Sequence, residues 1–126
     1  LKVIPSHIDL SGGELEIAGF VSRETRLRDV LLSSINNDYD FIFLDCPPAL
    51  NLLTLNALTA AHSVLIPVQP EYLALNGLTM LQKTIELAKK QLNKTLCIEG
   101  ILLTLYHPSL DPAKLIEEEL KKNMAL

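Results

Sequence analysis

The chain has 126 residues, of which 48% are hydrophobic and 21% charged, and its formal net charge is −4. This length is enough for one domain with a real core, and the composition excludes an intrinsically disordered chain. No apolar run approaches the roughly 20 residues that a membrane-spanning helix needs. The negative charge argues against a strong nucleic-acid-binding surface on this segment, because phosphate binding needs clustered Lys and Arg.

The first half of the chain predicts strands at residues 1–5 and 41–44 with helices between them. The four consecutive apolar residues at 41–44 are typical of a strand buried on both faces of a parallel sheet. Ser11 and Glu14 have the S-x-x-E spacing of a capping box, which predicts the start of a short helix. Residues 22–36 repeat apolar side chains at three- and four-residue steps, as an amphipathic helix does.

The second half alternates helices and strands. We expect a helix over 50–61, a strand over 63–68, a helix over 75–92, a strand over 96–104 and a last helix capped by Asp111. Strands that alternate with helices of this length imply parallel strands and right-handed crossovers. The expected fold class is therefore α/β: a mostly parallel sheet with helices on both faces, in one domain without repeats or linkers.

Polar residues follow three of the predicted strands, and the carboxyl ends of parallel strands form the edge where α/β sheets bind ligands. These residues are Asp45, then Gln69 with Glu71, then Thr104 with Tyr106. After Asp45, Pro47 and Pro48 stop the strand and stiffen the loop. A carboxylate at this edge is costly to bury unless it is solvated, hydrogen-bonded or near a cation. The same pattern fits a capping aspartate in a tight turn, and the pattern alone does not separate the two.

Other candidate sites are weaker. The motifs G-x-S-x-G and H-E-x-x-H are absent, and the histidines show no ligand spacing. The pair Gly12-Gly13 lacks a following Lys-Ser or Lys-Thr, which favours a turn or helix start over a phosphate loop. Cys46 has no cation beside it in the sequence to lower its pKa, which favours a packed thiol over a nucleophile. No catalytic residue is assigned.

The two cysteines, Cys46 and Cys97, have neither metal-ligand spacing nor a disulfide framework, which predicts a reducing cytoplasm. The chain begins without a signal peptide and without an initiator Met, so residue 1 is not expected to be the natural start.

Three strings are specific in combination. They are Y-D-F-I-F-L-D-C-P-P over 39–48, L-L-T-L-N-A-L-T-A-A over 52–61 and V-L-I-P-V-Q-P-E-Y-L-A-L-N-G-L over 64–78. Together they closely resemble the ParA/Soj family, the deviant Walker ATPases of chromosome and plasmid partition, which are relatives of MinD. The resemblance continues through 98–104 and reaches back to residues 22–24 and to Pro5, so it covers nearly the whole chain.

The resemblance implies a P-loop NTPase-like fold of the deviant Walker A class, with ATP and Mg²⁺ as cofactors. It places Asp45 on the Walker B aspartate, which holds Mg²⁺, usually through water. It places Pro47 and Pro48, with Cys46, on the loop that senses the γ-phosphate. It places Gln69 and Glu71 on a loop near the nucleotide and the subunit partner. Pro70 stands where the family has Cys, a small departure.

The family's deviant Walker A loop, of the K-G-G-x-G-K-T type, does not occur in this chain. We therefore expect residues 1–126 to be the central, incomplete part of a single ATPase domain, inactive by itself. By resemblance, the parent hydrolyses ATP, forms an ATP-dependent homodimer, binds DNA non-specifically and responds to a ParB-type partner. Its expected place is the cytoplasm, at the nucleoid and not at a membrane. The alternatives are a non-catalytic interaction domain on the same scaffold and a MinD-like membrane-cycling ATPase.

Overall fold

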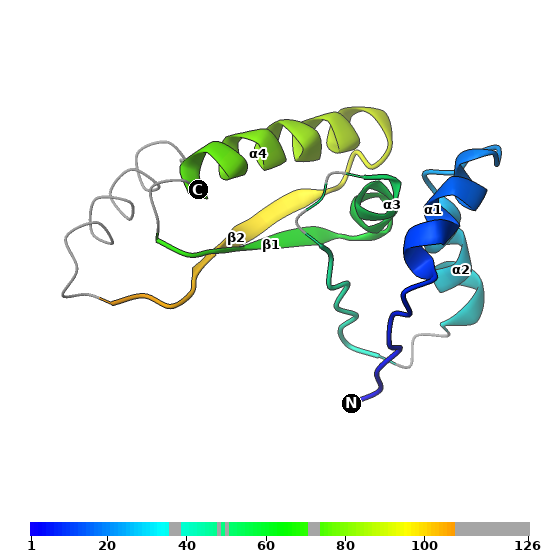
Figure 1. Ribbon diagram of the computed structural model, residues 1–126, viewed down its shortest axis with the longest axis horizontal. Helices are drawn as coiled ribbons and strands as arrows, with labels where there is room; N and C mark the ends of the chain where they lie inside the picture. The colour runs from blue at the N-terminus through cyan, green and yellow to red at the C-terminus, as the bar shows by residue number, and fades with distance from the viewer. Residues whose placement is uncertain (36–38, 48, 50, 71–73, 108–126) are drawn as a thin grey trace. The chain divides into compact units, whose positions relative to one another are not determined.

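The computed structural model describes residues 1–35, 39–47, 49, 51–70 and 74–107. The chain forms two compact units, Leu1–Ala61 and His62–Leu126, each with its own secondary structure (Figure 1). The first unit contains helices α1 (Leu10–Ala18), α2 (Arg26–Ser34) and α3 (Leu52–Ala60), and the second contains strand β1 (Ser63–Val68), helix α4 (Ala74–Gln91) and strand β2 (Cys97–Leu103).

The second unit is a β–α–β arrangement. Its strands β1 and β2 are parallel and hydrogen-bonded, with Ser63 opposite Cys97 at one end and Val68 opposite Leu103 at the other. The register is irregular between Val64 and the residue after it. Helix α4 connects the strands and runs along them (Figure 1). The parallel topology confirms the α/β fold class, and β1 has the bounds that the sequence predicted.

The core of the second unit follows from simple periodicities. Along the second half of β1, burial alternates: Ile66 and Val68 are buried, whereas Leu65 and Pro67 are exposed. On α4, Leu78, Ile85 and Ala88 are buried at helical spacing. These two sets form the apolar layer between the helix and one face of the strands.

In the first unit, both α1 and α2 contact α3. Helix α3 buries the apolar residues Ala57 and Leu58, as expected. It also buries three polar residues: Thr54, Asn56 and Thr59. A buried polar group needs a hydrogen-bond partner to offset the loss of water. The polar contacts of α3 therefore define how this unit is held together.

The strands predicted at 1–5 and 41–44 are wrong for the described residues, where neither segment has strand structure. Leu1 and Ile4 are largely exposed, and so are Phe41 and Phe43, at 78% and 86% of their surface. A strand exists through its hydrogen bonds to a neighbouring strand. No described residue of this unit forms a strand that could supply those bonds.

Two predicted helix starts also need correction. Helix α1 begins at Leu10, ahead of Ser11, and its N-cap residue Asp9 makes no side-chain capping bond. The predicted capping box of Ser11 and Glu14 is therefore wrong. Helix α2 begins at Arg26 because the chain before it turns: Ser22 adopts a left-handed φ of 56°, a conformation that cannot continue a right-handed helix.

None of the helices in the described part of the chain combines the length and hydropathy that a bilayer-spanning segment requires. The helix predicted after Asp111 lies outside the described residues.

Candidate functional site

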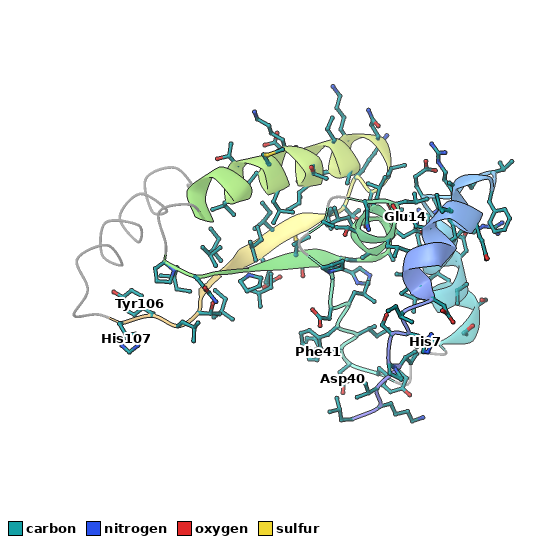
Figure 2. All side chains as sticks on the ribbon, viewed as in Figure 1. His7, Glu14, Asp40, Phe41, Tyr106 and His107 are labelled. Atoms are coloured by element: carbon teal, nitrogen blue, oxygen red, sulfur yellow. The ribbon has the colours of Figure 1, made fainter. Side chains whose placement is uncertain are left out.

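Asp45 lies in a segment of the first unit, residues 39–47, that has neither helix nor strand structure. Figure 2 shows the side chains of Asp40 and Phe41 on the same segment. The rings of Phe41 and Phe43 stack with their centroids 6.3 Å apart. Asp45 is exposed, and no described residue forms a hydrogen bond or ion pair with its carboxylate. Its oxygens are therefore open to water or to a hydrated cation.

Cys46 follows directly, and its thiol is not activated. The residue is exposed, so the prediction of a packed thiol is wrong. Its Sγ donates a weak hydrogen bond to the carbonyl of Leu44 at 3.6 Å. Partial desolvation of the sulfur, reinforced by the negative charge of Asp45, raises the pKa of Cys46. The thiolate is the reactive form, so at neutral pH this cysteine is a poor nucleophile, as the sequence predicted.

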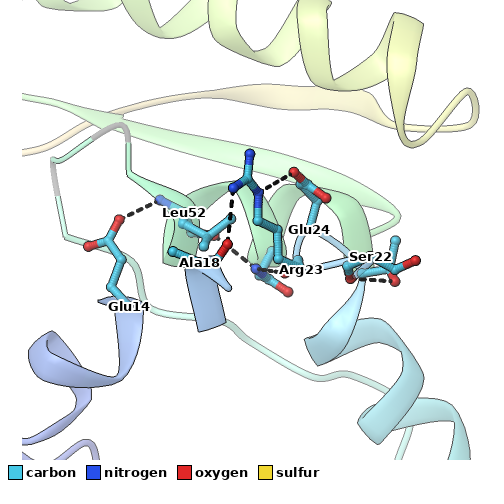
Figure 3. A network of polar contacts seen from close by, with 8 residues as sticks. Glu14, Ala18, Ser22, Arg23, Glu24 and Leu52 are labelled. Carbon is cyan, nitrogen blue, oxygen red and sulfur yellow. Dashed lines mark hydrogen bonds and ion pairs between the residues drawn. The ribbon is translucent and has the colours of Figure 1, made fainter. Parts of the chain in front are cut away.

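The Asp45 segment leads into the start of α3, which is capped twice. Asn51 is the N-cap residue, and its side-chain oxygen accepts from the Thr54 amide at 3.0 Å. Glu14, on α1, accepts from the Leu52 amide at 2.8 Å (Figure 3). It also accepts from the Asn51 side-chain nitrogen at 3.2 Å. The Thr54 hydroxyl donates to the carbonyl of Ala49. Four hydrogen bonds thus fix the chain where it enters the helix.

Asn56 forms a second polar junction, between α3 and the turn before α2. It is only 4% exposed. Its Oδ1 accepts from the Leu27 amide at 3.1 Å, and its Nδ2 donates to the carbonyls of Arg23 at 2.8 Å and Leu52 at 2.9 Å. Asn56 thereby satisfies its own polar atoms and ties the two segments together.

The side chain of Arg23 closes the same turn on its other side (Figure 3). Its Nη1 donates to the Ala18 carbonyl at 3.1 Å, at the last residue of α1. Its Nε donates to the Glu24 carboxylate at 2.9 Å, and this bond lowers the pKa of Glu24. A cation at a helix C-terminus complements the partial negative charge there.

In the second unit, the carboxyl ends of β1 and β2 lie side by side, as predicted. The Thr104 amide donates to the Val68 carbonyl at 2.9 Å, so Gln69 and Thr104 follow neighbouring strands. Gln69 is exposed. Leu105 has a φ of 51°, which turns the chain away from the strand direction before Tyr106 and His107 (Figure 2). This pair of strand ends is one polar edge.

The predicted site residues are therefore placed as follows. Asp45 and Pro47 are exposed in the first unit, and Gln69 is exposed in the second. Pro48 and Glu71 lie outside the described residues. Among the residues that the structure describes, no three His, Cys, Asp or Glu side chains gather as a metal site would require.

The sequence pattern missed the roles of Glu14 and Asn56. The S-x-x-E spacing predicts that Glu14 is half of a local capping box, whereas in the structure Glu14 caps a different helix. Asn56 lies inside a segment whose apolar residues predict a packed helix, and the pattern gives no role to the asparagine. No local pattern identifies either contact, because each partner is distant in sequence.

Residues 1–98 match a family model described as an AAA domain (AAA_31). The chain is 49% identical over 122 residues to the sporulation initiation inhibitor protein Soj of Bacillus subtilis, aligning 97% of this chain with 48% of that protein. It is 50% identical over 121 residues to the chromosome partitioning protein ParA of Myxococcus xanthus, aligning 96% of this chain with 42% of that one. The chain thus spans about half the length of the curated relatives it matches.

Solved structures give the same relation. The crystal structure of cobyrinic acid a,c-diamide synthase from Mycobacterium smegmatis superposes with a TM-score of 0.88 at 35% identity, over 97% of this chain and 49% of that one. A second structure of that protein, with bound ATP analog and magnesium, has the same TM-score of 0.88 and identity of 35%, with 50% of its chain covered. The shared portion is an α/β fold with parallel strands.

Proposed function

This chain belongs to the AAA domain family and, within it, to the group of Soj and ParA partition proteins; from that premise we propose that it is the central part of one ATPase domain. The complete protein would bind ATP with Mg²⁺, dimerise on DNA and drive chromosome or plasmid segregation. The observation that carries this proposal is the placement of Asp45, exposed at the end of an apolar segment, in a chain 49% identical to Soj.

Asp45 is the proposed metal-linked acid. Mg²⁺ prefers oxygen ligands and dehydrates reluctantly, so it keeps several waters and takes one or two carboxylates together with phosphate oxygens. The Asp45 carboxylate fits that role because no described side chain occupies its oxygens. When bound, Mg²⁺ supplies charge neutralisation at the phosphates. The Asp45 carboxylate would orient the water molecules bound to Mg²⁺.

Pro47 and Pro48 are proposed to shape the loop that senses the γ-phosphate. Proline fixes φ, so a loop with two adjacent prolines has few conformations. Gln69 and Glu71 are proposed to lie near the nucleotide and the subunit partner. Phosphoryl transfer is catalysed mainly by positioning and by charge stabilisation. These residues are therefore assigned to binding and positioning, and none of them to covalent catalysis.

The groups that cradle the phosphates are proposed to lie outside residues 1–126. A phosphate-binding loop needs successive backbone N–H groups and a lysine. No K-G-G-x-G-K-T type string occurs in this sequence. In this proposal the ParB-type partner, the DNA contacts and the homodimer interface also draw on segments beyond this chain.

The test is Mg²⁺-dependent ATP hydrolysis by the protein expressed from the complete reading frame. Asp45→Ala should abolish turnover and leave the fold intact, because Asp45 is exposed and its removal leaves no core cavity. Asp40→Ala is the matched control, since Asp40 is an exposed aspartate on the same segment. Wild-type turnover in Asp45→Ala would contradict the assignment. An inactive wild-type protein would favour a non-catalytic interaction domain.

A further inference from the structure

The feature that the function leaves unexplained is the double cap on α3. Asn51 already satisfies the Thr54 amide at 3.0 Å, as an ordinary N-cap does. Glu14 adds a charged cap from another helix. Its Oε1 accepts from the Leu52 backbone amide at 2.8 Å, and its Oε2 accepts from the Asn51 side-chain nitrogen at 3.2 Å. A carboxylate at a helix N-terminus is favoured by the unpaired N–H groups and by the helix dipole.

Glu14 is held in place by its own helix, α1 (Figure 3). The end of α1 is in turn tied down, because the Arg23 guanidinium donates to the Ala18 carbonyl at 3.1 Å. Glu14 is partly buried, so its bonds are less exposed to competition from water than those of a surface side chain. Glu14 is therefore held on α1 at the same time as it holds the first turn of α3.

The residues that Glu14 bonds, Asn51 and Leu52, follow the proposed metal-linked acid closely in the sequence. Residues 45–51, here called the Asp45 loop, run from that acid to the residue before α3. Pro47 has a restricted φ, and the Ala49 carbonyl accepts from the Thr54 hydroxyl in the first turn of α3. Because the loop is short, a displacement of its end changes the positions that Asp45 can take at its beginning. The end of this loop is the point that Glu14 holds.

We propose that Glu14 is a positioning residue: by holding the first turn of α3, it sets where the Asp45 loop ends and thereby where the Asp45 carboxylate stands. This inference rests on the proposed function, in which that carboxylate must be aimed at a metal-bound nucleotide. Positioning acts on the transition state more than on nucleotide affinity. Loss of Glu14 should therefore lower kcat and leave KM nearly unchanged.

The donors and acceptors at this junction allow a swap experiment. In Glu14→Gln the new amide nitrogen faces the Asn51 nitrogen, so two donors oppose each other. In Asn51→Asp two carboxylates oppose each other, although aspartate caps a helix as well as asparagine does. In the double variant Glu14→Gln/Asn51→Asp, a glutamine donor meets an aspartate acceptor. The Leu52 amide and the Thr54 amide keep their acceptors.

The expected result, in the protein from the complete reading frame, is a kcat lowered about tenfold in each single variant and restored to within about twofold in the double variant. The KM for ATP should stay within about twofold throughout. Glu16→Ala, an exposed glutamate on the same helix, is the control and should match wild type. Far-UV circular dichroism at the assay temperature verifies that each variant is folded.

A second readout is independent of turnover. Cys46 lies in the Asp45 loop, so its rate of alkylation by iodoacetamide reports how the loop is held. Each single variant should alkylate Cys46 at a rate different from wild type, and the double variant should restore the wild-type rate. Cys97, in the other unit, should be unaffected.

Wild-type kcat and wild-type Cys46 alkylation in both single variants would overturn the inference. The inference would also be overturned if the reduction in kcat of the double variant equalled the product of the reductions in the two single variants. If Asp45→Ala is inactive while Glu14→Gln behaves as wild type, only this inference fails. If Asp45→Ala itself retains full turnover, the proposed function fails.

Discussion

Asn56→Ala should be among the most destabilising single substitutions in the first unit. Asn56 is 4% exposed and makes three hydrogen bonds, of 2.8 Å, 2.9 Å and 3.1 Å, to backbone groups. Each neutral hydrogen bond contributes about 1 kcal/mol, and water that enters the site recovers part of the loss. We expect the free energy of unfolding to fall by about 2–3 kcal/mol.

The assay is urea unfolding followed by far-UV circular dichroism, with the protein from the complete reading frame. The change in midpoint multiplied by the slope m gives the change in free energy of unfolding. Ser33→Ala is the control: its hydroxyl bonds only the Val30 carbonyl on an exposed helix face, so it should cost at most about 0.5 kcal/mol. An Asn56→Ala variant as stable as that control would refute the view that Asn56 joins α3 to the turn before α2.

Two further predictions test other parts of the structure. Asp45→Asn should lower the pKa of Cys46, because the adjacent negative charge helps to raise it, and should speed alkylation of Cys46 near pH 8 while leaving Cys97 unchanged; equal rates in the variant and the wild type would show that the two groups do not interact. Ile85→Ala, at a position 2% exposed, should cost about 2–5 kcal/mol of unfolding free energy, whereas Leu87→Ala, at a position 57% exposed, should cost far less; similar losses would contradict the assigned buried face of α4.

The second unit was predictable because its signals are local. The apolar run at 63–68 and the helical repeat in α4 each lie within one element, and periodicity alone assigns them. Alternation of strand and helix then fixes parallel pairing through the usual crossover. The structure accordingly reproduces β1 at its predicted bounds and places the ends of α4 and β2 within one residue of theirs.

The first unit was harder to predict because its determinants are distant in sequence. The run at 41–44 has strand composition, but a strand also needs a partner, and composition carries no information about the partner. Ser22 has a left-handed φ, which delays the start of α2, and nothing about a serine predicts that conformation. Glu14 and Asn56 act on partners 38 and 29 residues away.

For the candidate site, the sequence indicated which acid to examine but not how it is held. The apolar run followed by Asp45 and two prolines predicts a site at this loop, and the structure shows that Asp45 is exposed there. The support for that loop comes from α1, through a glutamate with no distinguishing pattern of its own. Support of this kind depends on packing geometry, which single-sequence patterns do not encode.

The central claim is that this chain supplies the metal-linked acid of an ATP site whose phosphate-binding loop lies outside residues 1–126. Calorimetric titration of Mg-ATP into two proteins, residues 1–126 alone and the product of the complete reading frame, tests it most directly. We predict saturable binding by the complete protein and none by residues 1–126 below roughly millimolar concentration, where binding is worth only about 4 kcal/mol. Micromolar Mg-ATP binding by residues 1–126 alone would contradict the claim.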